Sequence, residues 1–186
     1  MEGLRIIVAV SGASGSVYAR RLLDALVASA EVAEVALIFS SHARAVAEQE
    51  GVCLEVESPK VRIYDNDDMF APPASGSADY DAMAIVPCSM GVVGRVASGV
   101  SIDLISHAAD VVVKERARLV VVPREAPLST IHLRNLTTLS ECGAVVIPAS
   151  PSFYSRPATI EELTDTIVER VLKHLGLHTP HYQWGK

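Results

Sequence analysis

Short apolar runs alternate with amphipathic segments along the whole chain, and this alternation limits the possible folds more than any other feature of the sequence. The apolar runs occupy residues 4–10, 35–39, 61–64, 82–86, 119–122 and 144–147. Segments of helical periodicity lie at 17–29, 42–49, 91–98, 102–116, 130–140 and 159–175. Strands that alternate with helices form βαβ units. We therefore predict one doubly wound α/β domain over residues 1–186, Rossmann-like or flavodoxin-like, with a mostly parallel sheet of about five strands and a tail from about residue 176.

The composition indicates where the apolar surface goes. Hydrophobic residues make up 49% of the chain but aromatic residues only 5%, and the mean hydropathy is +0.30. No apolar run reaches the ~18 residues of a membrane span. We expect the excess to be buried inside the domain or against other copies of the chain, so the sequence predicts an oligomer with no membrane association.

Charge and cysteine content limit the cellular compartments and the classes of binding partner that fit this chain. The formal net charge is −6, which argues against nucleic acid as a partner because such binding needs a basic surface. The three cysteines form no CxxC pair, and the N-terminus runs into a strand pattern without a signal-peptide pattern. We therefore predict a cytoplasmic protein. The six histidines show no strong ligand spacing, so no catalytic metal is expected.

Ligands of doubly wound folds bind at the carboxyl ends of the strands. The first such end carries Gly12-Ala13-Ser14-Gly15. Its glycines allow close backbone approach, and the helix that follows favours a phosphate, although an ordinary βα turn explains the same residues. At the third end, Ser89 can cap a helix or bind a ligand. Cys88 is better explained as a buried structural cysteine than as a nucleophile.

Two opposite charges, Arg124 and Glu125, directly follow a buried strand. Arg124 suits bidentate phosphate binding, and Glu125 can orient it or move a proton; a surface ion pair is the alternative. Lys114 ends an apolar helix, where it either complements the helix dipole or binds phosphate near Arg124. Glu50 ends another helix. It is either a proton-transfer group in an apolar pocket or a solvated carboxylate at the helix end.

The last helix carries a further candidate. Ile160, Leu163, Ile167, Val171 and Leu175 are expected to form its buried stripe. Arg170 then falls at the edge of this stripe, half-buried, where it either snorkels or binds an anion together with the Tyr154 hydroxyl. Lys173 is expected to point into solvent, and Thr159 with Glu162 is expected to form a capping box at the helix start.

Taken in order, these segments resemble the UbiX-type flavin prenyltransferases. The likeness covers nearly the whole chain. It is carried by Ser11–Gly15, Pro72–Ser77, Pro87–Met90, Ala108–Asp110, Lys114–Arg116, Val122–Pro127, Gly143–Pro148, Phe153-Tyr154 and Trp184.

The resemblance implies a metal-independent, homododecameric flavoprotein that binds FMN between protomers. Such an enzyme joins the dimethylallyl group of dimethylallyl monophosphate to N5 and C6 of reduced FMN. The product, prenylated FMN, serves UbiD-type decarboxylases.

The resemblance also implies roles for individual residues. The expected FMN contacts are Gly12, Ala13, Ser14, Ser40, Ser89, Met90, Gly91, Val92 and Arg124. The expected phosphate end of the prenyl site comprises Lys114, Arg124, Glu125, Tyr154 and Arg170. Ser14 and Glu50 resemble the pair that handles protons on the flavin, Glu125 is expected to help protonate the leaving phosphate, and Trp184 is expected to offer a ring face to the allylic group. The chain departs from the family pattern at Val92, where a threonine is common, and at Ser41, where a lysine is common.

Two other functions fit the same fold. One is an FMN-dependent cysteine decarboxylase, which needs a catalytic histidine and an asparagine in the flavin loop, where this chain has Pro87-Cys88-Ser89-Met90. The other is a non-catalytic flavin-binding subunit of an aromatic-acid decarboxylase. In that case the charges at 114, 124, 125 and 170 would be partly idle.

Overall fold

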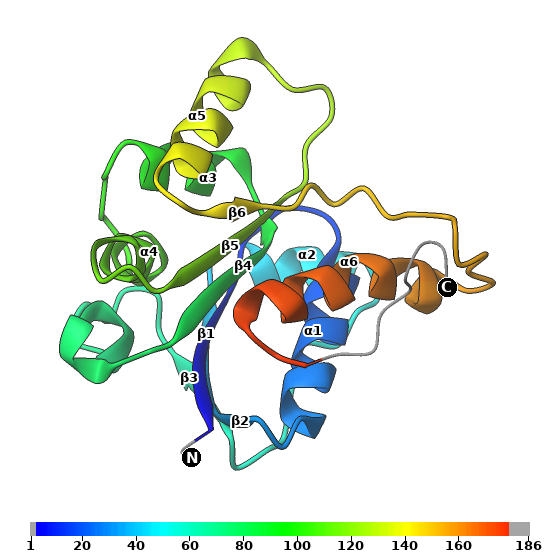
Figure 1. Cartoon of the computed structure of the whole chain (residues 1–186), viewed down its shortest axis with the longest axis horizontal. Coiled ribbons are helices and arrows are strands. Elements are labelled where there is room, and N and C mark those ends of the chain that lie inside the picture. The colour runs from blue at the N-terminus through cyan, green and yellow to red at the C-terminus, as the bar shows by residue number, and fades with distance from the viewer. Residues whose placement is uncertain (1–2, 179–186) are drawn as a thin grey trace.

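A single parallel sheet forms the centre of the structure, a computed structural model that describes residues 3–178 (Figure 1). Its six strands stand in the order β3-β2-β1-β4-β5-β6. The strands are β1 (Leu4–Val10), β2 (Val32–Phe39), β3 (Val61–Tyr64), β4 (Ala82–Cys88), β5 (Arg118–Pro123) and β6 (Val145–Val146). The chain order reverses between β1 and β4, which places the ligand crevice of a doubly wound fold at their carboxyl ends. The doubly wound prediction is confirmed, with six strands rather than about five.

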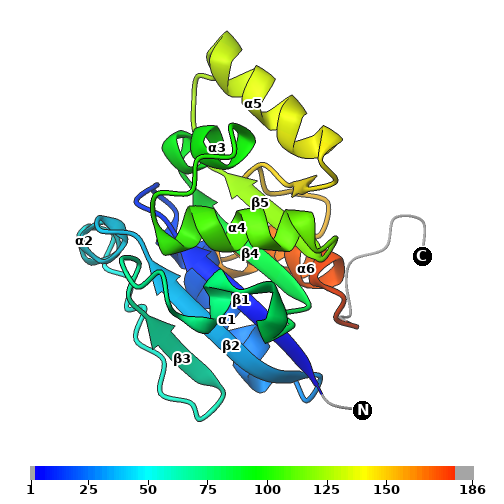
Figure 2. The ribbon, with the colours of Figure 1, turned by 90° about the vertical axis from the view of Figure 1, so that its left-hand side faces the viewer.

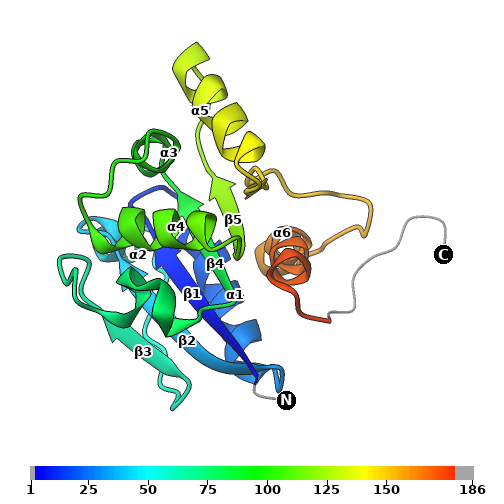
Figure 3. The same ribbon diagram turned by 60° about the vertical axis from the view of Figure 1, so that its left-hand side comes forward.

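Helices cover both faces of this sheet. They are α1 (Ser16–Ala28), α2 (Ala43–Gln49), α3 (Met90–Ala97), α4 (Leu104–Lys114), α5 (Thr130–Glu141) and α6 (Ile160–Leu175). Figures 1 and 3 show α1 and α6 side by side on one face and α3 and α4 on the other. Strand β1 serves both cores: Ile6, Val8 and Val10 pack towards α1 and α6, and Ile7 and Ala9 towards α4. Burial on both faces explains why the strands read as continuous apolar runs.

Helix α5 stands away from the body of the domain (Figure 1). Leu139 is its only buried residue. The side chains of Leu128, Ile131 and Leu133, on α5 and just before it, remain 41%, 67% and 51% exposed. This apolar surface is unusual for an isolated domain.

The start and stripe of α6 differ from the sequence expectation. Ile160 is 69% exposed, Arg170 is exposed rather than half-buried, and the buried stripe consists of Thr164, Ile167, Val168, Val171, Leu172 and Leu175. Thr159 caps the helix by accepting from the Glu162 N–H at 3.1 Å. The Glu162 carboxylate accepts from the Ala158 N–H at 2.6 Å. In the expected capping box the donor of this second hydrogen bond would be the N–H of Thr159, one residue later.

Over residues 3–178, no helix combines the length and the apolar character that crossing a bilayer requires.

Candidate active site

Ser11 ties the carboxyl ends of β1 and β4 together. It is 1% exposed, and its hydroxyl donates to the Pro87 carbonyl at 2.7 Å while accepting from the Ser89 N–H at 2.8 Å. The Arg124 N–H donates to the Cys88 carbonyl at 3.1 Å, which adds the end of β5 to the same group. Three of the loops predicted to hold the ligand are therefore held side by side.

Gly12 allows the first loop to approach the start of α2 closely. A β-carbon at this position would lie 2.8 Å from the β-carbon of His42, which is well inside normal contact. The Ser40 N–H donates to the Val10 carbonyl at 2.9 Å. This bond joins the chain just before Gly12 to the chain just before His42, so Ser40 lies beside their contact. The backbone of this loop is thus packed so closely against the start of α2 that a side chain larger than glycine would clash.

The loop that leads into α3 can offer a ligand its backbone groups and one side-chain hydroxyl, that of Ser89. Ser89 is the N-cap of α3, but its side chain makes no capping hydrogen bond, so the capping interpretation is wrong and the hydroxyl remains for a ligand. Met90 and Val92 are 8% and 2% exposed, because both side chains pack into the core. These two predicted flavin contacts therefore offer only backbone groups, whereas Gly91 is exposed.

Arg95 lies next to this loop and was not singled out by the sequence. One of its terminal guanidinium nitrogens would lie 3.8 Å from a β-carbon at Gly91, and the other pairs with Asp103 at 3.4 Å. Its Nε is buried without a hydrogen-bond partner among the described residues. The only available signal was the helical spacing of four residues from Gly91.

Glu50 occupies the N-terminus of α1. Its two carboxylate oxygens accept from the Gly15 and Ser16 N–H groups at 2.8 and 2.7 Å. Partial burial of the carboxylate raises its pKa, but the hydrogen bonds from the Ser14 side chain and from these two backbone groups together outweigh burial and lower the pKa.

Two sequence expectations change as a result. The helix end that was expected to favour a phosphate already holds a carboxylate, and like charge excludes a second anion from the same N–H groups. Glu50 is also exposed rather than enclosed by apolar residues. Because it is deprotonated at neutral pH, it can accept a proton through Ser14 but has none of its own to donate.

We expect Glu50→Gln to destabilise the protein by about 1 kcal/mol at pH 7, because it weakens a cap of α1. The folded-state pKa of Glu50 is lowered, so its stabilisation is complete above the ordinary pKa of 4.5 and is lost as the pH falls through the folded value. Thermal unfolding of both proteins at equal concentration, from pH 7 to pH 3, measures the effect. A difference that stays constant down to pH 3 would contradict the assignment.

Arg124 and Glu125 follow β5 and do not pair with each other. Both are exposed, and Glu125 accepts from the N–H of Ala126 at 3.1 Å. Among residues 3–178, Arg124 has no carboxylate within 4 Å. Neither the surface ion pair nor the orienting role of Glu125 is found, and the Arg124 guanidinium remains available for an anion.

Lys114 lies at the opposite edge of the sheet from Arg124. It ends α4, just before β5 begins, whereas Arg124 follows the end of β5. Six strand residues separate the two edges by roughly 20 Å, and Figure 2 shows α4 running against the direction of β5. Lys114 pairs with Glu115 at 2.7 Å. One copy of the chain therefore does not bring Lys114 and Arg124 together.

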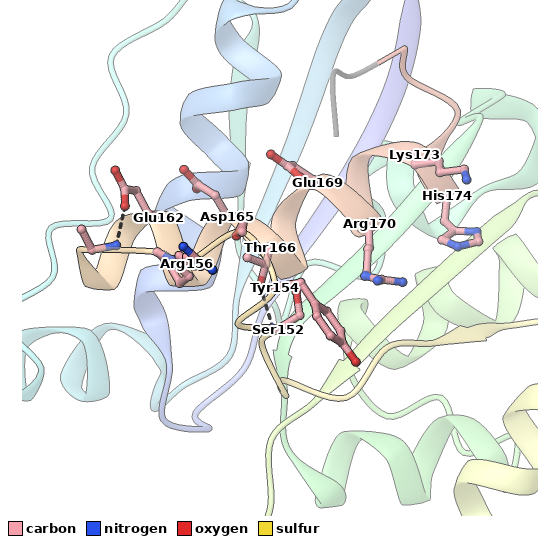
Figure 4. Close-up of a pocket in the computed structure, with 13 residues that line it drawn as sticks. Ser152, Tyr154, Arg156, Glu162, Asp165, Thr166, Glu169, Arg170, Lys173 and His174 are labelled. Carbon is pink, nitrogen blue, oxygen red and sulfur yellow. Dashed lines mark hydrogen bonds between the residues drawn. The ribbon is translucent and has the colours of Figure 1, made fainter. Parts of the chain in front are cut away.

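Tyr154 and Arg170 share a pocket along α6 of about 1090 Å³. Figure 4 shows both side chains directed to the same side, Tyr154 from the loop before α6 and Arg170 from the helix. Lys173 is exposed, as expected, and it also lines this pocket. Arg124, Glu125 and Lys114 are not part of its lining. The five predicted phosphate ligands thus occupy three separate places on one protomer.

Three sequence expectations remain: the role of Cys88, the role of Trp184 and the absence of a catalytic metal. Cys88 is fully buried, and burial raises the pKa of its thiol to about 12, which fits a structural cysteine. Trp184 lies outside the described residues. Within those residues, no group of three His, Cys, Asp or Glu side chains could hold a metal ion. Sequence reasoning missed Ser11, His42 and Arg95 as site-forming residues, since each acts through a contact that spacing alone does not reveal.

Known proteins resemble this chain over most of its length. A family model described as Flavoprotein matches residues 1–172. The flavin prenyltransferase UbiX of Methanocaldococcus jannaschii is 40% identical over 98% of this chain and 99% of its own. Two solved structures match closely. The complex of AnUbiX (PadA1) with FMN and dimethylallyl pyrophosphate has a TM-score of 0.90 at 39% identity and covers 99% of this chain and 98% of its own. A dodecameric FMN-dependent UbiX-like decarboxylase from Escherichia coli O157:H7 has a TM-score of 0.88 at 35% identity and covers 98% of this chain and all of its own.

The fold alone does not distinguish one flavin-binding family from another, because decarboxylases less than 20% identical to this chain share it. The identity level does, because it is sustained from end to end against curated relatives of one kind. The chain therefore belongs to the flavoprotein family and, within it, to the UbiX-type flavin prenyltransferases.

Proposed function

We propose that this protein is a flavin prenyltransferase that joins the dimethylallyl group of dimethylallyl monophosphate to N5 and C6 of reduced FMN. The observation that carries the proposal is the position of the Glu50 carboxylate, which the Gly15 and Ser16 N–H groups hold next to Ser14 in the loop of residues 11–15, in a chain of this family. The Ser14–Glu50 pair is suited to accept protons beside a ligand held by that loop. Prenylated FMN would then pass to a UbiD-type decarboxylase.

The residues at the carboxyl edge fit FMN. Gly12 exposes its backbone, the Ser89 hydroxyl is not used as a cap, and the exposed Arg124 guanidinium is available to a phosphate. When bound, the reduced flavin supplies one electron pair for each of the two new bonds. The protein's own part is to bind both substrates, exclude water and stabilise the leaving phosphate, which departs with the electron pair of the broken allylic C–O bond.

The separation of Lys114 from Arg124 supports a site shared between copies. A cation from the amino edge of one sheet can reach the carboxyl edge of another only across a contact between protomers. The exposed apolar side chains of α5 supply surface for such a contact. We propose a dodecamer, the assembly that the related Escherichia coli structure has, and we propose the cytoplasm, since all three cysteines are unpaired.

Anaerobic incubation of the purified protein with reduced FMN and dimethylallyl monophosphate tests the proposal. We expect free phosphate and an extracted flavin that is heavier by one prenyl unit in mass spectrometry. Bound flavin of unchanged mass would overturn it in favour of a flavin-binding subunit. Release of CO2 from a peptide with a C-terminal cysteine would point instead to a cysteine decarboxylase.

We expect Gly12→Ala to weaken FMN binding at least tenfold, because the new methyl group meets the His42 β-carbon at 2.8 Å and must displace the loop. Quenching of flavin fluorescence on titration measures the dissociation constant.

Gly94→Ala is the matched control for this substitution. Gly94 is helical, and a β-carbon there would make an ordinary 3.5 Å contact with Asn135. The control should bind FMN as the wild type does and gain up to about 1 kcal/mol of stability. Equal FMN affinity in both variants and the wild type would remove Gly12 from the flavin site.

A further inference from the structure

Arg44 lies at the carboxyl edge of the sheet, just beyond β2, and the proposed function gives it no role. It is the second residue of α2, which follows β2 after a short turn in which the Ala43 N–H donates to the Ser40 carbonyl at 3.1 Å. The guanidinium carbon of Arg44 lies over the Phe39 ring, 4.2 Å from its centre. Phe39 is the last residue of β2 and only 8% exposed, so its ring is a fixed support. The Arg44 charge is therefore held beside Ser40.

This charge has no counter-charge within the described chain. Among residues 3–178, no carboxylate lies within 4 Å of the Arg44 guanidinium, whereas Arg5, Arg20 and Arg21 each pair with one. A guanidinium that lies over an aromatic ring keeps the N–H groups at its rim for hydrogen bonds to an anion. Arg44 is thus a positioned cation at the edge where ligands of this fold bind.

Two other arginines follow strands at this edge, and both already have a partner or a role. Arg95, after β4, pairs with Asp103 at 3.4 Å. Arg124, after β5, is assigned above to the leaving phosphate of the prenyl donor. Because β1 and β4 stand between β2 and β5, the two sides of the crevice are three strand spacings, or roughly 14 Å, apart. Arg44 and Arg124 are therefore placed for two different anionic groups.

The flavin brings a phosphate of its own, and the place expected for it is taken. The N-terminus of α1 holds the Glu50 carboxylate through the Gly15 and Ser16 N–H groups, and a second anion there would meet like charge. A flavin phosphate must find its counter-charge elsewhere along the edge. Arg44, beside Ser40 at the end of β2, offers that charge next to β1.

We propose that Arg44, supported by the Phe39 ring, binds the phosphate of FMN and makes the protein select FMN over riboflavin. The proposal rests on the flavin binding of the proposed function and names the residue that recognises the phosphorylated form. The guanidinium donates to two phosphate oxygens, and the Ser40 hydroxyl donates to a third. Phe39 touches no ligand and is a positioning residue. Arg124 is left to the phosphate of the prenyl donor.

Titration of the flavin-free protein with FMN and with riboflavin, followed by flavin fluorescence, tests this assignment without turnover. We expect Arg44→Ala to weaken FMN binding at least tenfold and to leave riboflavin binding within twofold of the wild type, since only FMN carries the charge. Arg44→Lys keeps the charge but loses the fork, so its FMN affinity should lie between the two. An equal loss of affinity for both flavins, or an unchanged affinity for FMN, would overturn the proposal.

Arg62→Ala is the matched control, because it removes another exposed arginine that has no carboxylate within 4 Å in the described residues, from the edge strand β3. Both flavin affinities should stay at the wild-type values. Phe39→Leu keeps an apolar side chain in the core but removes the ring under Arg44. It should lower the preference for FMN over riboflavin roughly threefold. A preference equal to that of the wild type would remove the ring from the proposal.

Arg124→Ala, titrated in the same way, tells the two phosphates apart. Its preference for FMN over riboflavin should stay near that of the wild type, and a fall confined to Arg124→Ala would overturn the assignment of Arg44. Turnover is a separate readout. If the wild type prefers FMN but yields no prenylated flavin, the proposed prenyl transfer fails, and the two flavin affinities of Arg44→Ala still decide this inference.

Discussion

Replacing Arg124 with alanine should lower the rate of prenyl transfer by roughly a hundred- to a thousand-fold, the cost of removing one preorganised donor to a developing anion. Arg124 directly follows β5, and its N–H is fixed to the Cys88 carbonyl, so the position of its side chain is set by the sheet. The guanidinium is exposed and has no carboxylate within 4 Å in the described residues. It is therefore free to bind phosphate, and its loss leaves that charge uncompensated.

Steady-state rates of phosphate release, measured with saturating reduced FMN, check this result. Arg124→Lys keeps the charge but loses the bidentate fork, so an intermediate rate is expected. The melting temperature should change little, because the side chain is exposed. A rate within twofold of the wild type would exclude Arg124 from the site.

Most elements of this fold were predictable because the central strands β1, β2, β4 and β5 are largely buried on both faces. Residues such as Ile6 to Val10 have no solvent-facing positions, so their apolar run marks a strand regardless of what packs on it. The sequence was less informative where packing is one-sided. The predicted strand at 144–147 contains only two paired residues, and the stripe of α6 is rotated away from Ile160.

The site, like the fold, has parts that the sequence predicts and parts that it does not. Its loops were predictable, because the carboxyl ends of parallel strands always meet at one edge. The contacts between loops were not. Glu50 reaches the N-terminus of α1 from 35 residues away, and no spacing rule indicates that its carboxylate takes the place expected for a phosphate. The same holds for Ser11, whose hydroxyl bonds to residues that are far away in the sequence.

The position of Lys114 is the clearest case, because helix direction decides it. A helix between two parallel strands runs back from the carboxyl edge to the amino edge, so the end of α4 must lie at the far side of the sheet from the end of β5. Ten residues of sequence separate Lys114 from Arg124, yet the fold holds them apart by the length of a strand. Any site that uses both is made by two copies of the chain.

Mixed assemblies give this conclusion a quantitative test. Lys114→Ala alone should lower prenyl transfer at least tenfold, because a charge-assisted contact to the phosphate is lost, and Arg124→Ala alone lowers it further. In an assembly of equal numbers of both variants, each site draws Lys114 from one copy and Arg124 from another. A site is intact when the first copy carries Arg124→Ala and the second carries Lys114→Ala, so about one quarter of the sites should recover full activity.

Co-expression of the two variants with different affinity tags, followed by purification on both tags, yields these assemblies. Each variant co-expressed with a second copy of itself and purified in the same way is the control, and it should stay at the low rate of that variant. If Lys114 and Arg124 acted within one copy, every chain in the mixed assembly would carry a defect in its own site, and no activity would return. Recovery near one quarter therefore requires a site that spans two protomers, whereas a mixed assembly no more active than its parents would show that Lys114 does not serve the site that contains Arg124.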